Sequence, residues 1–293
     1  MPPSSTEPRW GVDSEYGRLR DVLLCGPDHF RWLPTSAISR ATIERGEHFD
    51  AAAARSQHAE MVSAYEGADV RVHFLEARPE LPYQVFTRDS STMTPGGTVV
   101  TQLHQWWRRG EYAPVIEFMR DHEVPVRGMV TAAALEGGDV VIVEPGAMLI
   151  GHGEERTQEP AARQLAAWME ADGWEARVVP IPGTFVHIDV LVSVLGPKLA
   201  VVCAEACPAG VLEWLRGRRF ELIEVAQEEA LRLGVNAISL GDDRVLSAAG
   251  SAELNGRLEA LGLEVLAPEL GMFTLGGGGA HCLAQPLRRD PVG

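Results

Sequence analysis

Short apolar runs alternate with amphipathic segments along most of the 293-residue chain. The apolar runs at 20–25 and 70–75 predict strands, and the segment between them at 51–66 predicts a helix. From residue 140 onward, a hairpin, a helix and a strand recur about every 50 residues, a period typical of radial or solenoid folds. The hairpins fall at 140–150, 190–203 and 235–247, the helices at 159–171, 209–216 and 252–261, and the strands at 177–179, 221–225 and 264–266. The pattern predicts an α/β fold of repeated units, with residues 1–293 forming one domain.

The segment 26–50 breaks this alternation. It is long and partly polar, and it contains His29, Trp32 and His48. Long insertions without regular structure in a compact domain are usually functional loops or disordered segments. We expect residues 26–50 to act as a lid over a site.

The charge and cysteine content limit the function classes. A formal net charge of −15 argues against nucleic acid or an anionic membrane surface as a partner, and it suits a small cationic substrate. Lys198 is the only lysine, which argues against a phosphate-binding lysine or a Schiff base. The four cysteines form neither a disulfide framework nor a zinc-ligand pattern, so we expect a reduced, cytoplasmic protein.

No dinucleotide fingerprint follows the first strand, and no apolar run is long enough to cross a bilayer. The sequence predicts no cofactor and no metal.

The glycine run 276–279, followed by Ala280, His281 and Cys282, is the most informative segment. Four glycines remove the side chains that would keep a ligand away from the main chain next to a thiol nucleophile. The alternative is a flexible loop that ends in a buried and inert cysteine.

Acidic residues and a histidine occur where predicted strands begin or end. The segment 86–89 places Asp89 at the end of a predicted apolar strand, and Glu136 comes before two glycines and a strand. His187 and Asp189 open another predicted strand, where a period of two places both on one face. Each residue alone is more often a turn cap or a structural group. Together with Cys282 they supply a nucleophile, an acid/base and several carboxylates. The carboxylates would raise the pKa of the thiol in an empty pocket. They are favourable if the ligand is a cation such as guanidinium, which pairs with carboxylates.

These segments, taken in order, resemble the guanidino-group-modifying enzymes, which include arginine deiminases, dimethylarginine dimethylaminohydrolases and amidinotransferases. The similar segments are distributed over almost the whole chain, at 14–24, 86–89, 135–139, 187–189 and 282–287. The resemblance implies an α/β propeller of five pseudo-symmetric units, known as the pentein fold. It also implies a small guanidino substrate.

The resemblance implies roles for individual residues. Cys282 would form a covalent amidino intermediate, and His187 would protonate the leaving amine and then activate water. Asp89 and Asp189 match the carboxylates that grip the guanidinium group. Glu136 matches the acid that holds the histidine or a guanidinium nitrogen.

Three arginines are candidates for the other end of the substrate. The segment 151–157 is similar to one whose arginine binds the substrate carboxylate, which makes Arg156 the first candidate and Arg108 or Arg109 the second. The alternative for all three is a solvated surface arginine.

The hydrolase and transferase branches remain to be distinguished. Asp189 matches the arginine deiminases and amidinotransferases, and His281 before Cys282 favours the amidinotransferases. The leading interpretation is a hydrolase that acts on the guanidine carbon of arginine or an arginine-like compound and gives a ureido product. The alternatives are an amidinotransferase and a non-catalytic guanidino-binding protein. The pair Trp106 and Trp107 would suit a homodimer interface, or else packs in the core.

Overall fold

The computed structural model describes residues 10–34 and 36–292. The strands are β1 (Leu19–Cys25), β2 (Arg71–Leu75), β3 (Ser91–Thr94), β4 (Gly97–Val100), β5 (Val126–Met129), β6 (Val140–Glu144), β7 (Ala147–His152), β8 (Glu175–Pro180), β9 (Val192–Gly196), β10 (Leu199–Val202), β11 (Glu221–Glu224), β12 (Ile238–Gly241), β13 (Arg244–Leu246), β14 (Glu264–Leu266) and β15 (Gln285–Arg289). The α-helices are α1 (Ala37–Glu44), α2 (Ala51–Gly67), α3 (Tyr112–Asp121), α4 (Glu159–Ala171), α5 (Val211–Gly217), α6 (Gln227–Leu231), α7 (Ala252–Ala260) and α8 (Gly271–Thr274).

The described strands form five three-stranded sheets with the same internal plan. In each sheet the middle strand has one antiparallel and one parallel neighbour. A connection with at least one helix leads from the middle strand to its parallel neighbour, as α4 leads from β7 to β8. In one sheet β15, from the end of the chain, pairs with β1 near its start, so that Leu19 faces Arg289. The mixed α/β fold predicted from the sequence is confirmed, and it is built from repeated sheets.

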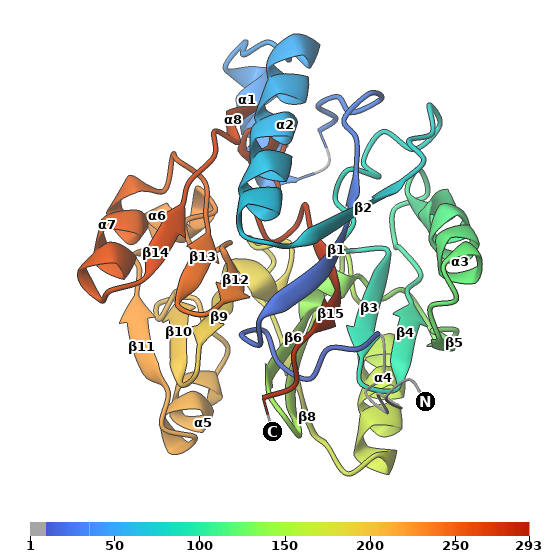
Figure 1. Cartoon of the computed structure of the whole chain (residues 1–293), viewed down its shortest axis with the longest axis vertical. Helices are drawn as coiled ribbons and strands as arrows, with labels where there is room; N and C mark the ends of the chain where they lie inside the picture. The colour runs from blue at the N-terminus through green and yellow to red at the C-terminus, as the bar shows by residue number, and fades with distance from the viewer. Residues whose placement is uncertain (1–9, 35, 293) are drawn as a thin grey trace, which may run out of the picture.

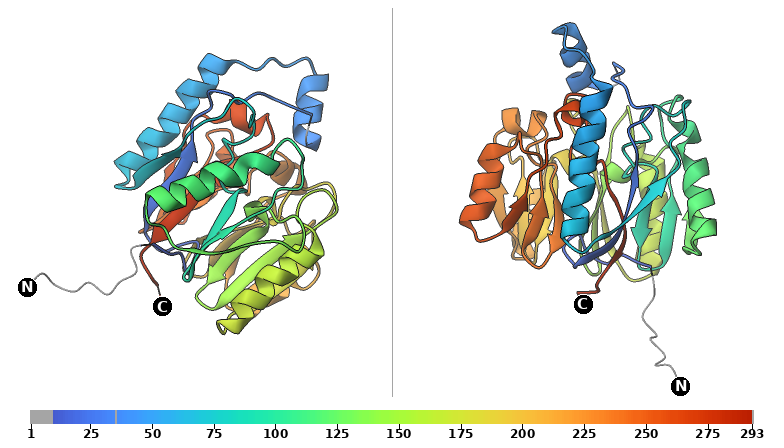
Figure 2. Two further views of the ribbon diagram at one scale, coloured as in Figure 1. Left: turned by 90° about the vertical axis from the view of Figure 1, so that its right-hand side faces the viewer. Right: turned by 45° about the horizontal axis from the view of Figure 1, so that its top comes forward.

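The sheets lie around a common centre, with helices α2, α3, α4, α5 and α7 on the outside (Figures 1 and 2). The antiparallel edge strands contact one another across sheet boundaries: β15 packs beside β3, β6 beside β9, and β9 beside β12. Their residues are almost all buried, as in β6, where Val140 to Val143 are at most 2% exposed. Continuous apolar runs of this kind are typical of strands that are covered on both faces.

Helix α4 illustrates how the outer layer forms. Ala161, Leu165 and Met169 recur at helical spacing and are fully buried against the sheet. A proline in the first turn favours the start of the helix, and an acidic Glu159 suits its positive end. The predicted boundaries 159–171 are confirmed, as is the predicted strand 264–266.

Two predicted strand segments near the site are wrong. Residues 86–89 form turns, in which the amide of Asp89 donates to Phe86 O and the hydroxyl of Thr87 donates to Leu23 O. His187 is extended, but residues 188–190 form a 3-10 turn because the amide of Ile188 donates to the buried carboxylate of Asp139 at 2.9 Å. His187 and Asp189 therefore do not share a strand face.

The segment 26–50 has more regular structure than predicted. It contains α1, which begins with a capping box between Ser36 and Ser39. Phe30 and Trp32 are buried, and the ring of Phe30 stacks on Phe273 at 5.4 Å between centroids. Residue 35 lies outside the described residues. The lid remains a prediction, and α1 is the part of this segment that fits it.

Helices long and apolar enough to traverse a bilayer are absent from the described part of the chain. The side chain of Trp106 is 76% exposed, so it does not pack in the core.

Candidate active site

The candidate residues lie in five connecting segments, each of which leads into the antiparallel edge strand of a sheet. These segments precede β3, β6, β9, β12 and β15, and they carry in that order Asp89, Glu136, the pair His187 and Asp189, Asn236, and Cys282. Because these edge strands gather at the centre of the fold, residues from nearly 200 positions apart in the chain meet there. The structure thus brings the predicted thiol, imidazole and carboxylates together.

Cys282 and His187 line the same small hollow. It has a volume of about 20 Å³ and is lined also by Ser36, Tyr83, Phe86, Asp89, Arg108, Arg156, Val186 and Gly276 to Gly278. This is room for about one water molecule. A guanidinium group therefore requires a small movement of the lining before it can enter.

The glycine run leads to Cys282 at this hollow, but protein side chains fill the space that Cβ atoms on Gly278 and Gly279 would need. A Cβ on Gly278 would lie 2.2 Å from the ring of Phe86, and one on Gly279 would lie 2.6 Å from Asn236 Oδ1. Gly277 has φ +101°, a conformation that glycine tolerates best. The glycines are needed for close packing around the cysteine, in addition to the open approach expected from the sequence.

The Cys282 thiol is 4% exposed, and its sulfur lies 3.6 Å from Asp189 Oδ2. Burial raises the pKa of this thiol well above its usual range, and the carboxylates of Asp189 and Asp89 raise it further. The backbone amide of Cys282 donates to Asn236 Oδ1 at 3.2 Å. The cysteine is therefore fixed in place but protonated while the hollow holds no cation.

His187 is held by two acids. Its Nε2 lies 2.8 Å from Glu136 Oε2, and its Nδ1 lies 3.7 Å from Asp89 Oδ1. Burial alone would lower the pKa of His187, but the charges of Asp89 and Asp139 and the hydrogen bond to Glu136 raise it to about 10. Gly138 makes this contact possible, because a Cβ there would lie 2.6 Å from Nδ1. The imidazole is cationic near neutral pH and can give up a proton.

Arg108 is one of two arginines that neutralise this cluster. It forms a two-point ion pair with Glu111 at 2.8 and 2.9 Å and donates to Asp89 Oδ2 at 2.7 Å. Asp89 Oδ1 also accepts from the amide of Gly138 at 3.2 Å. The protein's own guanidinium therefore occupies one face of Asp89, and Arg108 is embedded in the wall of the hollow.

Arg156 donates to Glu136 Oε2 at 3.3 Å. Burial would raise the pKa of Glu136, but Arg156, His187 and Arg108 together lower it well below its usual range. Arg156 also lines a second, larger cavity of about 750 Å³, which adjoins the small hollow through Ser36, Arg156 and Val186. This position places Arg156 between the two cavities.

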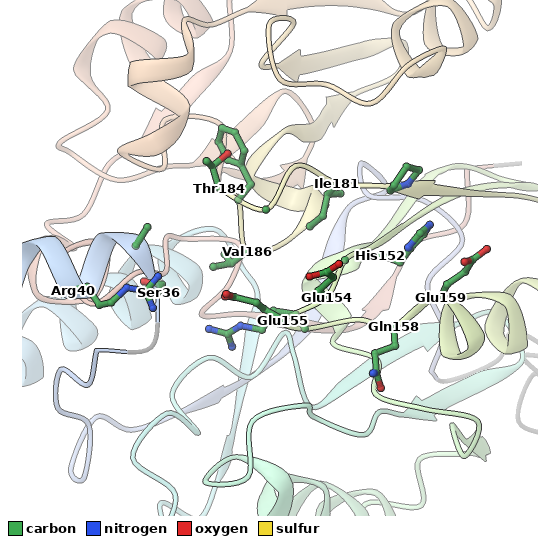
Figure 3. Close-up of a pocket in the computed structure, with 16 residues that line it drawn as sticks. Ser36, Arg40, His152, Glu154, Glu155, Gln158, Glu159, Ile181, Thr184 and Val186 are labelled. Carbon is green, nitrogen blue, oxygen red and sulfur yellow. The ribbon is translucent and has the colours of Figure 1, made fainter.

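The larger cavity lies between α1 and the loops around residues 152–159 and 180–186 (Figure 3). Ser36 and Arg40 face it from α1 and its N-terminal cap, opposite Glu154, Glu155 and Thr184 (Figure 3). Most of these side chains are partly or fully exposed. A substrate can extend through this cavity towards the thiol.

Arg109 lies apart from both cavities, so substrate binding by Arg109, the alternative to Arg108, stays a prediction. Its side chain is exposed, donates to His104 O at 3.3 Å and lines neither cavity. Arg109 begins a 3-10 turn (Arg109–Glu111) in which its neighbour Arg108 points inward, so the two arginines face opposite ways.

A metal site is geometrically conceivable at one place among the described residues. Ligand atoms of Asp89, Glu136 and His187 lie within 4.8 Å of one another. Arg108 and Arg156 already pair with these carboxylates, and a divalent cation there would face two buried guanidinium groups. The donor set fits an imidazolium held by acids better than it fits a metal ion.

Two residues of the site were missed by the sequence analysis as functional groups. Asn236 accepts from the backbone amides of His281 and Cys282 at 3.1 and 3.2 Å. His281 lies 2.8 Å from Asp189 Oδ2. Asn236 lies just before the edge strand β12, in the same position as Glu136 before β6 and Cys282 before β15. This shared position was the signal by which the sequence could have identified Asn236 as a site residue.

Comparisons with known proteins show which sequences and structures this chain resembles. A profile of the family described as "N,N dimethylarginine dimethylhydrolase, eukaryotic" matches residues 30–289. The uncharacterized protein YkgA of Bacillus subtilis is 28% identical over 283 residues, which cover 94% of each chain. Arginine deiminase of Mycobacterium marinum is 28% identical over 250 residues, which cover 72% of this chain and 62% of that enzyme. The chain therefore spans less than two thirds of the length of the deiminase.

Solved structures establish the fold. A mutant of the dimethylarginine dimethylaminohydrolase from Pseudomonas aeruginosa, complexed with citrulline, superimposes with a TM-score of 0.78 at 23% identity and covers 92% of this chain and 99% of its own. The N-terminal domain of ArgZ, a cyanobacterial arginine dihydrolase bound to substrate, gives a TM-score of 0.79 at 18% identity and covers 92% and 98%. Because the family profile covers most of the sequence, the chain belongs to the N,N-dimethylarginine dimethylhydrolase family of guanidino-group-modifying enzymes.

Proposed function

We propose that this protein is a hydrolase that attacks the guanidine carbon of arginine or an arginine-like compound through a covalent intermediate on Cys282. The observation that carries this proposal is the common hollow, which Cys282, His187 and Asp89 line together and which adjoins a larger cavity. A thiol nucleophile with a positioned proton donor is what displacement at this carbon requires.

In the first half of the reaction, the Cys282 thiol gives up its proton to water as the guanidinium binds, and the thiolate sulfur then bonds to the guanidine carbon. His187 donates its proton to the departing nitrogen, the carbon–nitrogen bond breaks, and ammonia or an amine leaves. In the second half, the now neutral His187 takes a proton from water, and the resulting hydroxide attacks the same carbon. The carbon–sulfur bond breaks, the thiolate is released and a ureido product forms. The sum is the substrate plus water giving the ureido compound plus ammonia or an amine.

The electrostatics of the hollow favour a cationic substrate. In the free protein, burial and then the carboxylates of Asp189 and Asp89 raise the pKa of the Cys282 thiol. A bound guanidinium would place a positive charge beside the sulfur and lower that pKa again. Asp189 Oδ1 is buried and has no hydrogen-bond partner within residues 10–34 and 36–292. We propose that it accepts an N–H from the substrate once the lining of the hollow has moved. An acceptor in this position suits a guanidine nitrogen that retains hydrogen.

Intact-mass analysis and product assays with a panel of guanidino compounds test the proposal. The panel includes arginine, monomethylarginine and dimethylarginine, each with and without an amine acceptor. We expect ammonia or amine release without the acceptor, and a covalent mass adduct on the wild type that is absent from Cys282→Ala. Turnover that requires the acceptor would identify an amidinotransferase. Binding that survives Cys282→Ala, without adduct or turnover in the wild type, would identify a binding protein.

We also propose that the five sheets form a closed five-unit propeller. The pairing of β15 with β1 joins the two ends of the chain, and contacts between the antiparallel edge strands link several neighbouring sheets. In such a closed ring, a circular permutant with new ends in an exposed loop should fold and retain activity. A permutant that unfolds at several such loops would contradict closure.

A further inference from the structure

A second histidine, His281, directly precedes the candidate nucleophile Cys282 in the sequence and contacts the same oxygen of Asp189. His281 is 3% exposed, and both nitrogens of its ring face carboxylate oxygens. Nδ1 lies 2.8 Å from Asp189 Oδ2, and Nε2 lies 3.5 Å from Glu15 Oε2. A neutral imidazole can donate from only one nitrogen, and its other lone pair would face an anion. The geometry points to an imidazolium whose Nδ1 donates to Asp189 and whose Nε2 makes a longer ion-pair contact with Glu15.

The two oxygens of Asp189 have different surroundings. The oxygen that His281 holds, Oδ2, is the one that lies 3.6 Å from the Cys282 sulfur. The other oxygen, Oδ1, is buried and has no hydrogen-bond partner within residues 10–34 and 36–292. Burying an unpaired carboxylate oxygen is costly, which is typical of a group that a ligand completes.

The backbone amides of His281 and Cys282 also share an anchor. The backbone amides of His281 and Cys282 both donate to Asn236 Oδ1, at 3.1 and 3.2 Å. Asn236 therefore fixes the backbone from which both the imidazole and the thiol extend.

The charges that face His281 come from several elements. Glu15 and Asp189 are the anions, and Arg88 lies 3.7 Å from Glu15 and donates to His281 O at 3.5 Å. Arg289 is buried and interacts with Glu15 electrostatically. With His281 protonated, this group has three cations and two anions immediately behind the thiol. That excess favours the thiolate, whereas a neutral His281 would leave the charges balanced.

We propose that His281, as an imidazolium between Asp189 and Glu15, is a positioning residue for this site. It fixes one oxygen of Asp189, leaves the other for the guanidinium of the substrate, and supplies positive charge behind the Cys282 sulfur. The part of this proposal that concerns substrate binding by Asp189 rests on the proposed function. The part that concerns the pKa of the Cys282 thiol applies to the free protein.

The first test measures the alkylation of Cys282 by iodoacetamide as a function of pH, followed by the mass of the peptide that contains it. In His281→Asn, the amide can still donate to Asp189 but has no charge. We expect the midpoint of alkylation to move upward by about one pH unit, the scale of a single nearby charge. The matched control is His58→Asn, which changes another buried histidine, located in α2 between Phe74 and Phe273. A folded His281→Asn protein with an unchanged alkylation profile would overturn the proposal.

The second test uses the wild type and remains decisive if the variant fails to fold. Neutron diffraction at neutral pH should locate deuterium on both ring nitrogens of His281. Deuterium on only one nitrogen would overturn the proposal. Neither test requires a substrate, so a failure to detect guanidine hydrolysis would count against the proposed function and leave this inference to be decided separately.

Discussion

The two adjoining cavities differ in almost every physical property. The inner hollow measures about 20 Å³, and the charged side chains around it are buried and mostly paired with one another. The outer cavity measures about 750 Å³ and is lined in part by exposed side chains, among them Arg40, Glu154 and Glu155. Arg156 belongs to both. Under the proposed function, this contrast would place the chemistry in the inner hollow and the recognition of the rest of the substrate in the outer cavity.

The reason for this separation is the cost of burying charge. A charged group removed from water needs a partner in a fixed position, so the inner groups are held in one arrangement. Exposed charges remain hydrated and can rearrange at little cost. We infer that the inner hollow selects the guanidinium group and that the outer cavity decides what that group is attached to.

The largest expected effect comes from the nucleophile. Cys282→Ala should reduce kcat on the best guanidino substrate on the order of 10⁴-fold or more, because no other group can form the covalent intermediate. Steady-state product assays measure the loss. Cys25→Ala changes another buried cysteine, lies outside both cavities and serves as the control. Retention of most activity by Cys282→Ala would remove the inner hollow from the chemistry.

The next effect concerns the acid/base. His187→Asn should lower kcat by roughly 10²- to 10⁴-fold, the usual range for general acid–base catalysis. The intermediate should form slowly and persist, so single-turnover experiments followed by intact mass would detect it. An unchanged rate of both half-reactions would mean that another group transfers the proton.

The sequence predicted the inner hollow better than the outer cavity. The chemical demands of a thiol reaction identify Cys282 and His187 by residue type, and both line one hollow. Local patterns could not reveal their anchors, because an asparagine before a strand looks like an ordinary turn residue. The hydrogen bond from Cys282 to Asn236 spans 46 residues and exists only after the chain has folded.

The arginines show the same limit. Arg108 and Arg109 are neighbours in the sequence, yet one is 2% exposed and paired with Glu111, and the other lies on the surface. Which of two adjacent residues points inward depends on a short turn that the hydrophobic pattern does not specify. The predicted strand at 86–89 failed for a related reason, because its backbone groups find partners in turns and in distant segments.

A third prediction uses the pH dependence of stability to test the inner hollow. The pKa of His187 is raised from 6.5 to about 10 in the folded state. The protonated group therefore contributes stability that is fully present below pH 6.5 and is lost as the pH rises through about 10. Urea unfolding of the wild type and His187→Asn should give a difference in the free energy of unfolding that shrinks across this window. A difference that is constant or grows with pH would contradict the paired imidazolium.

The smallest expected effects belong to the outer cavity, and they test where recognition begins. Arg156→Ala should raise KM for an arginine-like substrate about tenfold and also lower kcat, because Arg156 pairs with Glu136, which holds His187. Arg40→Ala should raise KM only a few-fold and leave kcat unchanged, because Arg40 lines the outer cavity and does not line the inner hollow. Arg120→Ala, an exposed arginine paired with Asp121, is the control. If Arg40→Ala lowered kcat as strongly as Arg156→Ala, binding in the outer cavity and chemistry in the inner hollow would be coupled, and the division between the two cavities would not hold.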